Sequence, residues 1–559
     1  MLRRIPRLVL SLVGTLGLTV APGAAQQGAP NGEWPTYGGD LGHTRYSALD
    51  QIDADNFGDL EVAWRFKTES LGPRPEFIFQ STPLMVGGVL YTTAGTRRAA
   101  VAIDAETGEM LWVHRLNEGE RGAGAPRRLS GRGLTYWDDG ADGVIFYVTP
   151  GYRLIALNAL TGHRITSFGD DGLVDLKQGL DQDIDPVTGE IGLHAAPIIS
   201  NGVIMIGAAH LAGVAPPTKE KPTGHVRGFD ARTGERKWIF HTIPGADEFG
   251  NDTWGGDSWR SGAGATWLTG SYDPDLNLLY WGIGNPGPDW NGDVRPGDNL
   301  YTASVMALDA DTGELRWHFQ YTPHDTHDWD ANQIQVLLDD DWEGEPRKLL
   351  VTANRNAFYY VLDRETGEFL HGVEYAKQTW SEGLDENGRA IVIPGTEPSY
   401  KGTLVWPSLQ GSTNWFSPSY SPLTGGFYVA VREMGAVYYK QDVDFEPGQP
   451  FLGGGEQRLD GDQAQGWVYA LDALTGERRW QFNLLSPPWS GVMATGGGLV
   501  FGGSQEGNIF ALDADTGEPL WSFYVGAATR TNPMSYAHLG KQYVVMSGGY
   551  GVFVFGLRD

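Results

Sequence analysis

The sequence predicts an all-β protein made of repeated four-stranded modules, and three observations support this prediction. A short phrase recurs along the 559 residues, and its clearest copy runs from Ala307 to Glu314, followed by Trp317. Glycine and tryptophan are abundant, with 79 and 20 residues, as tight turns and large packing anchors in repeated sheets require. No stretch keeps the 3.6-residue period of an amphipathic helix for long. Together these features favour antiparallel sheets.

Each copy of the phrase predicts the corner of a β-hairpin. An apolar strand ends at an acid, or once at an asparagine, then a Thr-Gly pair turns the chain and a second strand follows. Asp and Asn hydrogen-bond the backbone of such turns, and glycine supplies the positive φ. A tryptophan after most corners is expected to pack between neighbouring modules. The corner residues are Asp104, Asn158, Asp230, Asp309, Asp363, Asp472 and Asp513.

Seven corners and one split unit predict eight modules. Leu60–Phe66, with Trp64 at its centre, resembles the last strand of a unit whose first part is missing upstream. The C-terminal strands expected at Gln542–Val545 and Val552–Leu557 supply that part and close a ring. Propellers have about 4–8 blades of four strands, so the prediction is an eight-bladed β-propeller with tryptophan-docking repeats, one domain over residues 26–559. A β-solenoid is the alternative, but its rungs would be shorter and more uniform.

The N-terminus has the pattern of an export signal. Three arginines in the first seven residues precede the apolar run Leu8–Val20, and small residues follow up to Ala25. A basic start, a short apolar core and small residues predict a signal peptide over residues 1–25. An N-terminal membrane anchor is the alternative. No later segment is apolar for long enough to cross a membrane, so we expect a soluble, exported and periplasmic protein.

Composition excludes several classes of function. The chain has no cysteine, which excludes disulfides, thiolate metal sites, covalent c-type haem attachment and cysteine nucleophiles. The net charge of −28 argues against nucleic acid as a partner, although it is compatible with a basic protein carrier.

Two polar segments in long connections carry the chemistry. One is Gly282-Ile-Gly-Asn-Pro-Gly-Pro-Asp-Trp290, and the other is Thr322-Pro-His-Asp-Thr-His-Asp-Trp-Asp330. Function on a rigid ring is expected in such loops. With the tryptophan-ended repeats, the two segments resemble the pyrroloquinoline quinone (PQQ) dependent dehydrogenases, over the chain from about Trp34 to its end. That family consists of exported eight-bladed propellers that oxidise alcohols and aldoses.

The resemblance implies a set of site residues. Asp328 matches the catalytic base, and Arg355 matches the cation beside the reactive carbonyls of the quinone. Asn285 matches a metal-binding amide, and Asp330 adds a second carboxylate, which suits a trivalent lanthanide better than Ca²⁺, although both ions stay open. The residues matching the cofactor pocket are Gln80, Arg132, His194, Trp267, Arg355, Asn414, Trp415 and Trp489.

These residue types suit the cofactor that the resemblance implies. PQQ is a tricarboxylate with an electrophilic quinone carbonyl, so an aromatic floor such as Trp267 fixes its ring by stacking, and arginines pair with its carboxylates. A hard cation on oxygen ligands polarises the carbonyl. Asp328 takes the proton of the substrate hydroxyl while its hydride moves to the quinone.

The chain departs from the family pattern in several places. Pro126-Arg127-Arg128 stands where alcohol-oxidising relatives carry two adjacent cysteines. Aldose-oxidising relatives also lack these cysteines, so this feature favours aldoses, whereas the two polar segments favour alcohols. Both substrate classes therefore stay open. Gln80 replaces an expected Glu, and His194 replaces an expected Thr. Glu220 is the nearest candidate for the metal-ligand Glu.

Two other functions remain. One is a non-catalytic scaffold propeller of outer-membrane assembly type, which shares single repeats, and the other is a propeller that binds carbohydrate without oxidising it. For the dehydrogenase, the absence of a Cys-x-x-Cys-His motif means that no haem is attached to this chain. Electrons would leave to a separate carrier, either a soluble cytochrome c or a membrane quinone.

Overall fold

The computed structural model describes residues 28–558, except 77, 211–222, 447–450 and 460–463. Over these residues the chain is strand and loop, with one short α-helix, α1 (Gly119–Ala123). The 3₁₀ helices are η1 (Pro30–Gly32), η2 (Phe57–Asp59), η3 (Asn251–Thr253), η4 (Ser258–Ser261) and η5 (Gly292–Val294). The all-β prediction is confirmed. The signal peptide predicted over 1–25 lies outside the described residues, and in the described part no helix is long and apolar enough to cross a membrane.

The described chain contains eight sheets of four or more strands. The first four are β3 (Leu84–Val86) to β4 (Val89–Ala94), β5 (Ala99–Asp104) and β6 (Met110–His114); β7 (Thr135–Trp137) to β8 (Val144–Val148), β9 (Arg153–Asn158) and β10 (Leu173–Asp175); β11 (Ile198–Ser200) to β12 (Val203–Ile206), β13 (His225–Asp230) and β14 (Arg236–His241); and β15 (Ser271–Asp273) to β16 (Leu278–Gly282), β17 (Ser304–Asp309) and β18 (Leu315–Gln320).

The other four sheets and two small ones complete the fold. The four are β19 (Val336–Trp342) to β20 (Glu345–Ala353), β21 (Phe358–Asp363) and β22 (Phe369–Glu374); β26 (Ser419–Ser421), β27 (Gly426–Glu433), β30 (Gln465–Asp472) and β31 (Arg478–Leu484); β1 (Tyr46–Ser47) with β32 (Met493–Thr495), β33 (Leu499–Gly503), β34 (Asn508–Asp513) and β35 (Pro519–Tyr524); and β36 (Met534–His538), β37 (Lys541–Gly548), β38 (Gly551–Leu557) and β2 (Leu60–Lys67). The small sheets are β23 (Ser381–Leu384) with β24 (Ala390–Val392), and β25 (Thr403–Val405), β28 (Ala436–Lys440) and β29 (Gly454–Arg458).

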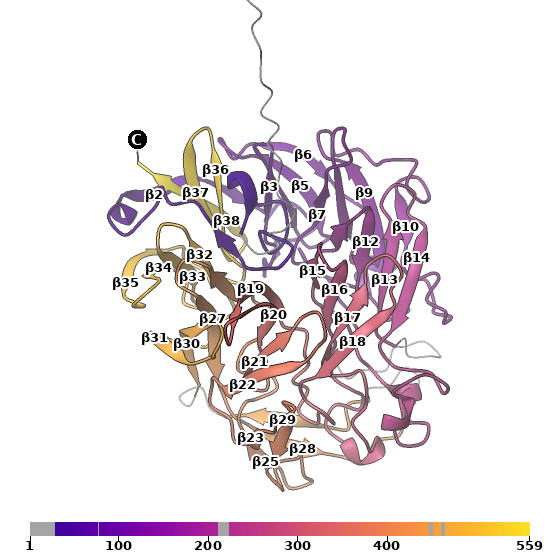
Figure 1. Ribbon diagram of the computed structural model, residues 1–559. Coiled ribbons are helices and arrows are strands. Elements are labelled where there is room, and N and C mark those ends of the chain that lie inside the picture. The colour runs from indigo at the N-terminus through magenta and orange to yellow at the C-terminus, as the bar shows by residue number, and fades with distance from the viewer. Residues whose placement is uncertain (1–27, 77, 211–222, 447–450, 460–463, 559) are drawn as a thin grey trace, which may run out of the picture.

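The two ends of the chain meet in one sheet, as the split unit predicts. β2 pairs antiparallel with β38, with Leu60 opposite Leu557, and Figure 1 shows the indigo β2 beside the yellow C-terminal strands. The larger sheets follow one another around the molecule in Figure 1, and their number equals the predicted number of blades. A ring closed in this way leaves no open edge between the first and last units.

The corner acids hold the turns as expected. At one corner, Asp309 Oδ1 accepts hydrogen bonds from the backbone N of Asp311 at 3.1 Å and of Thr312 at 3.0 Å. Gly313 follows with φ 74°, a conformation that glycine adopts without steric cost. The N–H of Gly313 donates to the Asp309 carbonyl at 2.8 Å, which closes the turn.

Tryptophans dock five of the modules on the next one. Trp238 donates from Nε1 to the carbonyl of Ala310 at 3.0 Å, and a Cβ placed on Gly313 would lie 2.5 Å from its ring. The indole therefore covers the neighbouring corner and needs glycine there. The same arrangement recurs for four other tryptophans with the glycines of the following corners: Trp64 on Gly108, Trp112 on Gly162, Trp317 on Gly367 and Trp480 on Gly517.

The N-terminal segment 28–47 runs through the middle of the ring. The first strands of neighbouring sheets contact one another, as β7 does β11, β15 does β19 and β26 does β32, so these strands form the inner wall. The segment hydrogen-bonds or pairs with five of them, at Met85, Tyr272, Leu337, Tyr420 and Ala494. One short stretch thus ties together sheets that are far apart in sequence.

Arg45 anchors this segment, and we expect its loss to destabilise the whole ring. Its buried guanidinium donates to the carbonyls of Pro533 at 3.1 Å and Tyr37 at 2.5 Å, and hydrogen bonds to charged groups contribute about 1.5–3 kcal/mol each. Arg45→Met should therefore lower the free energy of unfolding by about 3 kcal/mol, measured by urea denaturation. The exposed Arg65→Met is the control, and equal midpoints for the two variants would contradict this role.

Candidate active site

The residues expected at the site lie in loops at one end of the ring. Because successive strands are antiparallel, the loops entering first strands and the loops leaving second strands lie at the same end. Arg132 precedes β7, Trp267 precedes β15 and Asp328 precedes β19, whereas Asn285 follows β16 and Arg355 follows β20. The topology thus brings together positions that are far apart in the chain.

Eight of the expected residues line one cavity of about 190 Å³: Arg132, His194, Trp267, Asn285, Asp328, Asp330, Arg355 and Asn414. The rest of its lining is Arg127, His210, Ala263, Ala265, Leu409 and Gln410. A larger cleft of about 990 Å³, lined by residues such as Glu118 and Arg227, contains none of the expected residues. The smaller cavity is therefore the candidate active site.

Three other expected residues, Gln80, Trp415 and Trp489, are not part of the lining of this cavity. The Trp415 ring lies 4.4 Å from the guanidinium carbon of Arg132, which does line the cavity. The Trp489 ring lies 4.2 Å from the guanidinium carbon of Arg432, and the backbone N of Gln80 donates to Ser130 Oγ at 3.3 Å. Glu220 lies outside the described residues. The cofactor and metal roles of these four residues, like those of the eight that line the cavity, stay predictions.

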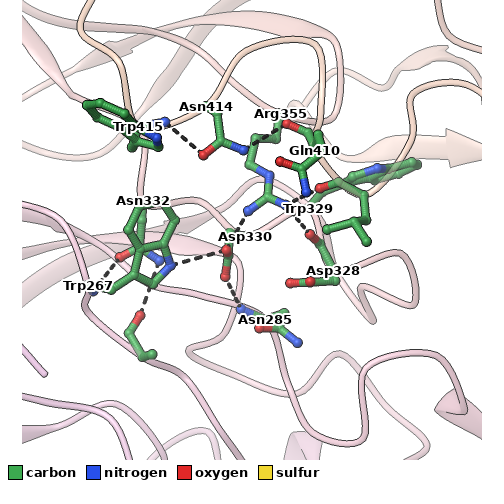
Figure 2. Close-up of polar contacts among 12 residues, drawn as sticks. Trp267, Asn285, Asp328, Trp329, Asp330, Asn332, Arg355, Gln410, Asn414 and Trp415 are labelled. Carbon is green, nitrogen blue, oxygen red and sulfur yellow. Dashed lines mark hydrogen bonds and ion pairs between the residues drawn. The ribbon is translucent and has the colours of Figure 1, made fainter. Parts of the chain in front are cut away.

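Asp330 joins three of the cavity residues (Figure 2). Its Oδ1 accepts from the backbone N of Asn285 at 2.8 Å, and its Oδ2 accepts from Trp267 Nε1 at 3.1 Å. The same Oδ2 pairs with Arg355 Nη1 at 2.5 Å, and both side chains of this ion pair are less than one-tenth exposed. The indole, the amide segment and the guanidinium are therefore positioned by one carboxylate.

The Asp328 carboxylate faces the same space with few contacts of its own. Figure 2 shows Asp328, Asp330 and Asn285 on one side of the Arg355 guanidinium. Arg355 Nη2 donates to the backbone carbonyl of Asp328 at 2.6 Å, and no hydrogen bond to the Asp328 carboxylate occurs among the described residues. Burial first, and then the charges of Asp330 and Asp289, raise the pKa of Asp328 well above its usual range. A bound cation would oppose that shift.

The backbone that presents these acids is held by Asp325. Asp328 and Asp330 both have positive φ, 57° and 50°, a conformation that Asp tolerates better than most residues. Asp325 accepts from the backbone N of His327 and of Trp329, each at 2.8 Å. His327 in turn stacks on Trp329, with ring centroids 4.3 Å apart, so this histidine is structural.

Arg295 connects the two polar segments, and sequence reasoning did not identify it. Its fully buried guanidinium donates to the carbonyls of Pro288 at 3.0 Å, Asp289 at 3.3 Å and Asp325 at 2.6 Å. Two of these carbonyls belong to the segment that carries Asn285, and the third belongs to the segment that carries Asp328 and Asp330. One side chain therefore fixes the two polar segments relative to each other. An arginine in a loop carries no sequence pattern that reveals which carbonyls it will bind.

The opposite side of the cavity is cationic. Arg132 is buried, its guanidinium carbon lies 5.1 Å from the Trp267 ring, and its Nε and Nη1 have no hydrogen-bond partner among the described residues. Burial, with repulsion from Arg127 and Arg98, lowers the pKa of Arg132 to about 9. Burial and the three arginines also lower the pKa of His194 well below its usual range, so that imidazole is neutral at pH 7.

Arg98 holds the backbone on this side, and it too was missed. Its guanidinium donates to the carbonyls of Leu193 at 2.5 Å, Arg127 at 2.8 Å and Leu129 at 3.2 Å. It thereby joins the stretch that carries Arg127 and Arg132 to the residue before His194. Buried arginines therefore hold the backbone on both the cationic and the acidic side of the cavity.

The acidic side supplies oxygen donors for a metal. The described residues contain no group of three or more His, Asp or Glu side chains that could hold a metal ion. The candidate donors are instead the carboxylates of Asp328 and Asp330 and the side-chain amide of Asn285, all of which line the cavity. Oxygen-only donors suit a hard cation such as Ca²⁺ rather than zinc or copper.

Comparison with known families gives two matches. A model described as the PQQ glucose/ethanol/alcohol dehydrogenase β-propeller domain matches residues 34–391. A second model, outer membrane protein assembly factor BamB, matches residues 464–555. The first match contains most of the cavity residues, whereas the second covers repeats near the C-terminus and none of them.

Individual proteins are similar over nearly the whole chain. Quinoprotein alcohol dehydrogenase PedH of Pseudomonas putida is 34% identical over 538 residues, which is 91% of this chain and 84% of that protein. The solved quinohemoprotein alcohol dehydrogenase of Comamonas testosteroni has a TM-score of 0.84 and 29% identity, covering 95% of this chain and 81% of the other. A europium-containing methanol dehydrogenase has a TM-score of 0.83 and 27% identity, covering 94% and 98%.

Proposed function

The chain belongs to the PQQ-dependent alcohol dehydrogenase family, and from that premise we propose that its cavity holds PQQ beside a hard cation and oxidises a substrate hydroxyl to a carbonyl. Asp328 is the base, and Arg132 and Trp267 bind the cofactor. The other residues proposed to contact it are Gln80, His194, Arg355, Asn414, Trp415 and Trp489. The proposed metal ligands are Asn285, Asp328 and Asp330, with Glu220 as a further candidate.

The observation that carries this proposal is the uncompensated charge of Arg132. A buried guanidinium with two nitrogens that find no partner in the described part of the chain is costly unless an anion binds it. PQQ is a tricarboxylate, and its carboxylate oxygens would accept charged hydrogen bonds from those nitrogens. The Trp267 ring, fixed at its indole N–H by Asp330, offers a flat surface for the tricyclic ring. The residues present therefore fit the cofactor.

The cation fits the opposite side of the cavity. Asp328, Asp330 and Asn285 supply oxygen donors, and Asp330 is already anchored by its contacts with Asn285 and Arg355. A donor set with two carboxylates suits Ca²⁺ and suits a trivalent ion still better. The similarity to a europium-containing methanol dehydrogenase supports testing a lanthanide beside calcium.

The protein's own contribution is placement and proton transfer. The chemistry that PQQ supplies when bound is acceptance of a hydride from the carbinol carbon. Asp328 accepts the hydroxyl proton at a carboxylate oxygen. Arg355 holds the backbone of Asp328 and the side chain of Asp330, so the base and the donor set keep one geometry. Asp325 and Arg295 fix the loop that presents them.

Substrate, acceptor and location are part of the proposal. Similarity to named alcohol dehydrogenases favours an alcohol over an aldose. Electrons leave to a separate carrier, a cytochrome c or a membrane quinone, because the chain has no cysteine to attach a haem. The basic and apolar N-terminus supports export to the periplasm with removal of residues 1–25, leaving the single domain 26–559.

Reconstitution tests the proposal directly. The purified protein is incubated with PQQ and either Ca²⁺ or a light lanthanide, and dye reduction is followed with primary alcohols, aldoses and polyols. We expect turnover only when both PQQ and a cation are present, and higher kcat/KM for primary alcohols than for aldoses. Omission of PQQ and addition of a chelator are the controls.

Two results would change the proposal. Higher kcat/KM for aldoses would move the substrate to sugars but keep the enzyme. No turnover with any metal, together with no PQQ binding in a fluorescence titration, would contradict the enzyme and favour a scaffold propeller. PQQ binding without turnover of any compound would contradict only the dehydrogenase reaction.

A further inference from the structure

Arg127 is the third arginine that lines the cavity, and the proposed reaction does not use it. It lines the cavity together with Arg132, Asp328 and Trp267. Its Nη2 donates to the carbonyl of His210 at 2.6 Å, whereas its Nε is buried and has no hydrogen-bond partner among the described residues. One nitrogen of the guanidinium is therefore fixed to the protein, while its Nε remains available to an acceptor.

Hydrogen bonds hold the backbone around Arg127, so its side chain extends from a defined position. Arg98 donates to the carbonyls of Arg127 at 2.8 Å and of Leu129 at 3.2 Å. The next residue, Arg128, has an exposed side chain. Two adjacent arginines thus have different surroundings, and only one of them reaches the cavity.

The charges in the cavity leave Arg127 without an anion of its own. Asp330 already pairs with Arg355 at 2.5 Å, and no ion pair joins Arg127 to any carboxylate among the described residues. Asp330, Asp328 and Glu190 influence Arg127 through longer-range attraction. In the proposed function the first two acids also hold the cation. Arg127 and Arg132 repel each other, so an anion between them would relieve both.

We propose that Arg127 binds a carboxylate inside the cavity, as a binding residue additional to Arg132. This inference rests on the proposed function, because the carboxylate has two sources in that reaction. It belongs either to PQQ or to a substrate that carries a carboxylate beside its hydroxyl, such as an ω-hydroxy acid. The chemistry is the same in both cases: the guanidinium donates charged hydrogen bonds to a carboxylate.

The experiment compares Arg127→Met with the matched control Arg128→Met, which removes the same charge one residue away. PQQ is titrated into each metal-loaded apoprotein by quenching of tryptophan fluorescence. Separately, kcat/KM is measured on the holoenzymes for 1-pentanol and for 5-hydroxypentanoate, two chains of equal length that differ in the carboxylate. Arg127→Lys is a second variant, which keeps the charge without the fork, and near-UV circular dichroism checks that each variant is folded.

The PQQ affinities and the substrate ratios of the variants distinguish the two sources of the carboxylate. A Kd for PQQ raised at least about tenfold in Arg127→Met, but not in Arg128→Met, assigns the carboxylate to the cofactor. An unchanged Kd, with kcat/KM for 5-hydroxypentanoate falling at least about tenfold relative to 1-pentanol, assigns it to the substrate. Arg127→Lys should lose less than Arg127→Met in either case.

Unchanged PQQ affinity and an unchanged substrate ratio in Arg127→Met would overturn the inference while leaving the proposed function intact. A wild-type protein that neither binds PQQ nor oxidises either compound would overturn both. Binding and catalysis in the wild type therefore separate failure of the proposed function from failure of this inference.

Discussion

Asp328→Asn is expected to lower kcat/KM for the preferred alcohol by about 10²–10⁴-fold, the contribution of a positioned general base. The amide has nearly the shape of the carboxylate but cannot accept the hydroxyl proton. The fold should be unaffected, because the contact that holds residue 328 is its backbone carbonyl on Arg355. Dye reduction with saturating PQQ and cation measures the loss, and a PQQ titration shows whether binding is retained.

The control for this variant is Asp311→Asn, an exposed acid at one of the corners. It removes the same charge far from the cavity and should retain wild-type turnover. Near-normal turnover of Asp328→Asn would exclude Asp328 as the base. Loss of PQQ and metal binding together with turnover would instead make Asp328 chiefly a ligand.

Asp330→Asn is expected to disturb the whole cavity rather than one chemical step. The Asp330 carboxylate receives donors from Asn285, Trp267 and Arg355. An asparagine has one acceptor oxygen, so its NH₂ group would face either the N–H of Asn285 or the donors of the indole and the guanidinium. Removing one partner of a buried ion pair costs about 3–5 kcal/mol, since Arg355 would stay buried without its counter-ion.

We therefore expect the free energy of unfolding of Asp330→Asn to fall by about 3 kcal/mol or more, with weaker PQQ binding and turnover reduced at least about 100-fold. Urea denaturation, PQQ titration and dye reduction measure the three effects. The matched control is Asp298→Asn, which breaks the exposed pair with Arg389 and should cost less than about 1 kcal/mol. Equal unfolding midpoints and wild-type PQQ affinity for Asp330→Asn would show that Asp330 is not the organising group.

The two variants separate chemistry from assembly. Among the described residues the Asp328 carboxylate accepts no hydrogen bond and its backbone carbonyl accepts one, whereas both oxygens of the Asp330 carboxylate accept hydrogen bonds. A large loss of turnover at unchanged stability is expected only for Asp328. Loss of stability together with cofactor affinity is expected only for Asp330. If both variants behaved alike, the division of roles between the two acids would be wrong.

The sequence by itself determined the repeat and much of the site. Corner acids, Thr-Gly pairs and tryptophans are local signals, because a turn needs its own residues and a docking indole needs a glycine at the next corner. The closure of the ring by Leu60–Phe66 could also be inferred, from a strand without its neighbours. Two polar segments carry Asn285, Asp328 and Asp330, and the structure brings these three residues to one cavity, where their roles stay predictions.

The tertiary structure alone decided which side chains support that cavity. Arg98 reaches the carbonyl of Leu193, 95 residues away in the chain, and Arg295 reaches that of Asp325. It also decided that Arg127 lines the cavity while Trp489 and Gln80 do not. The physical reason is that a buried guanidinium donates to whichever backbone carbonyls the fold brings near it. Every residue has a carbonyl, so the acceptors are set by tertiary structure. No sequence pattern distinguishes those carbonyls in advance, whereas the turns and tryptophans are specified by the residues that form them.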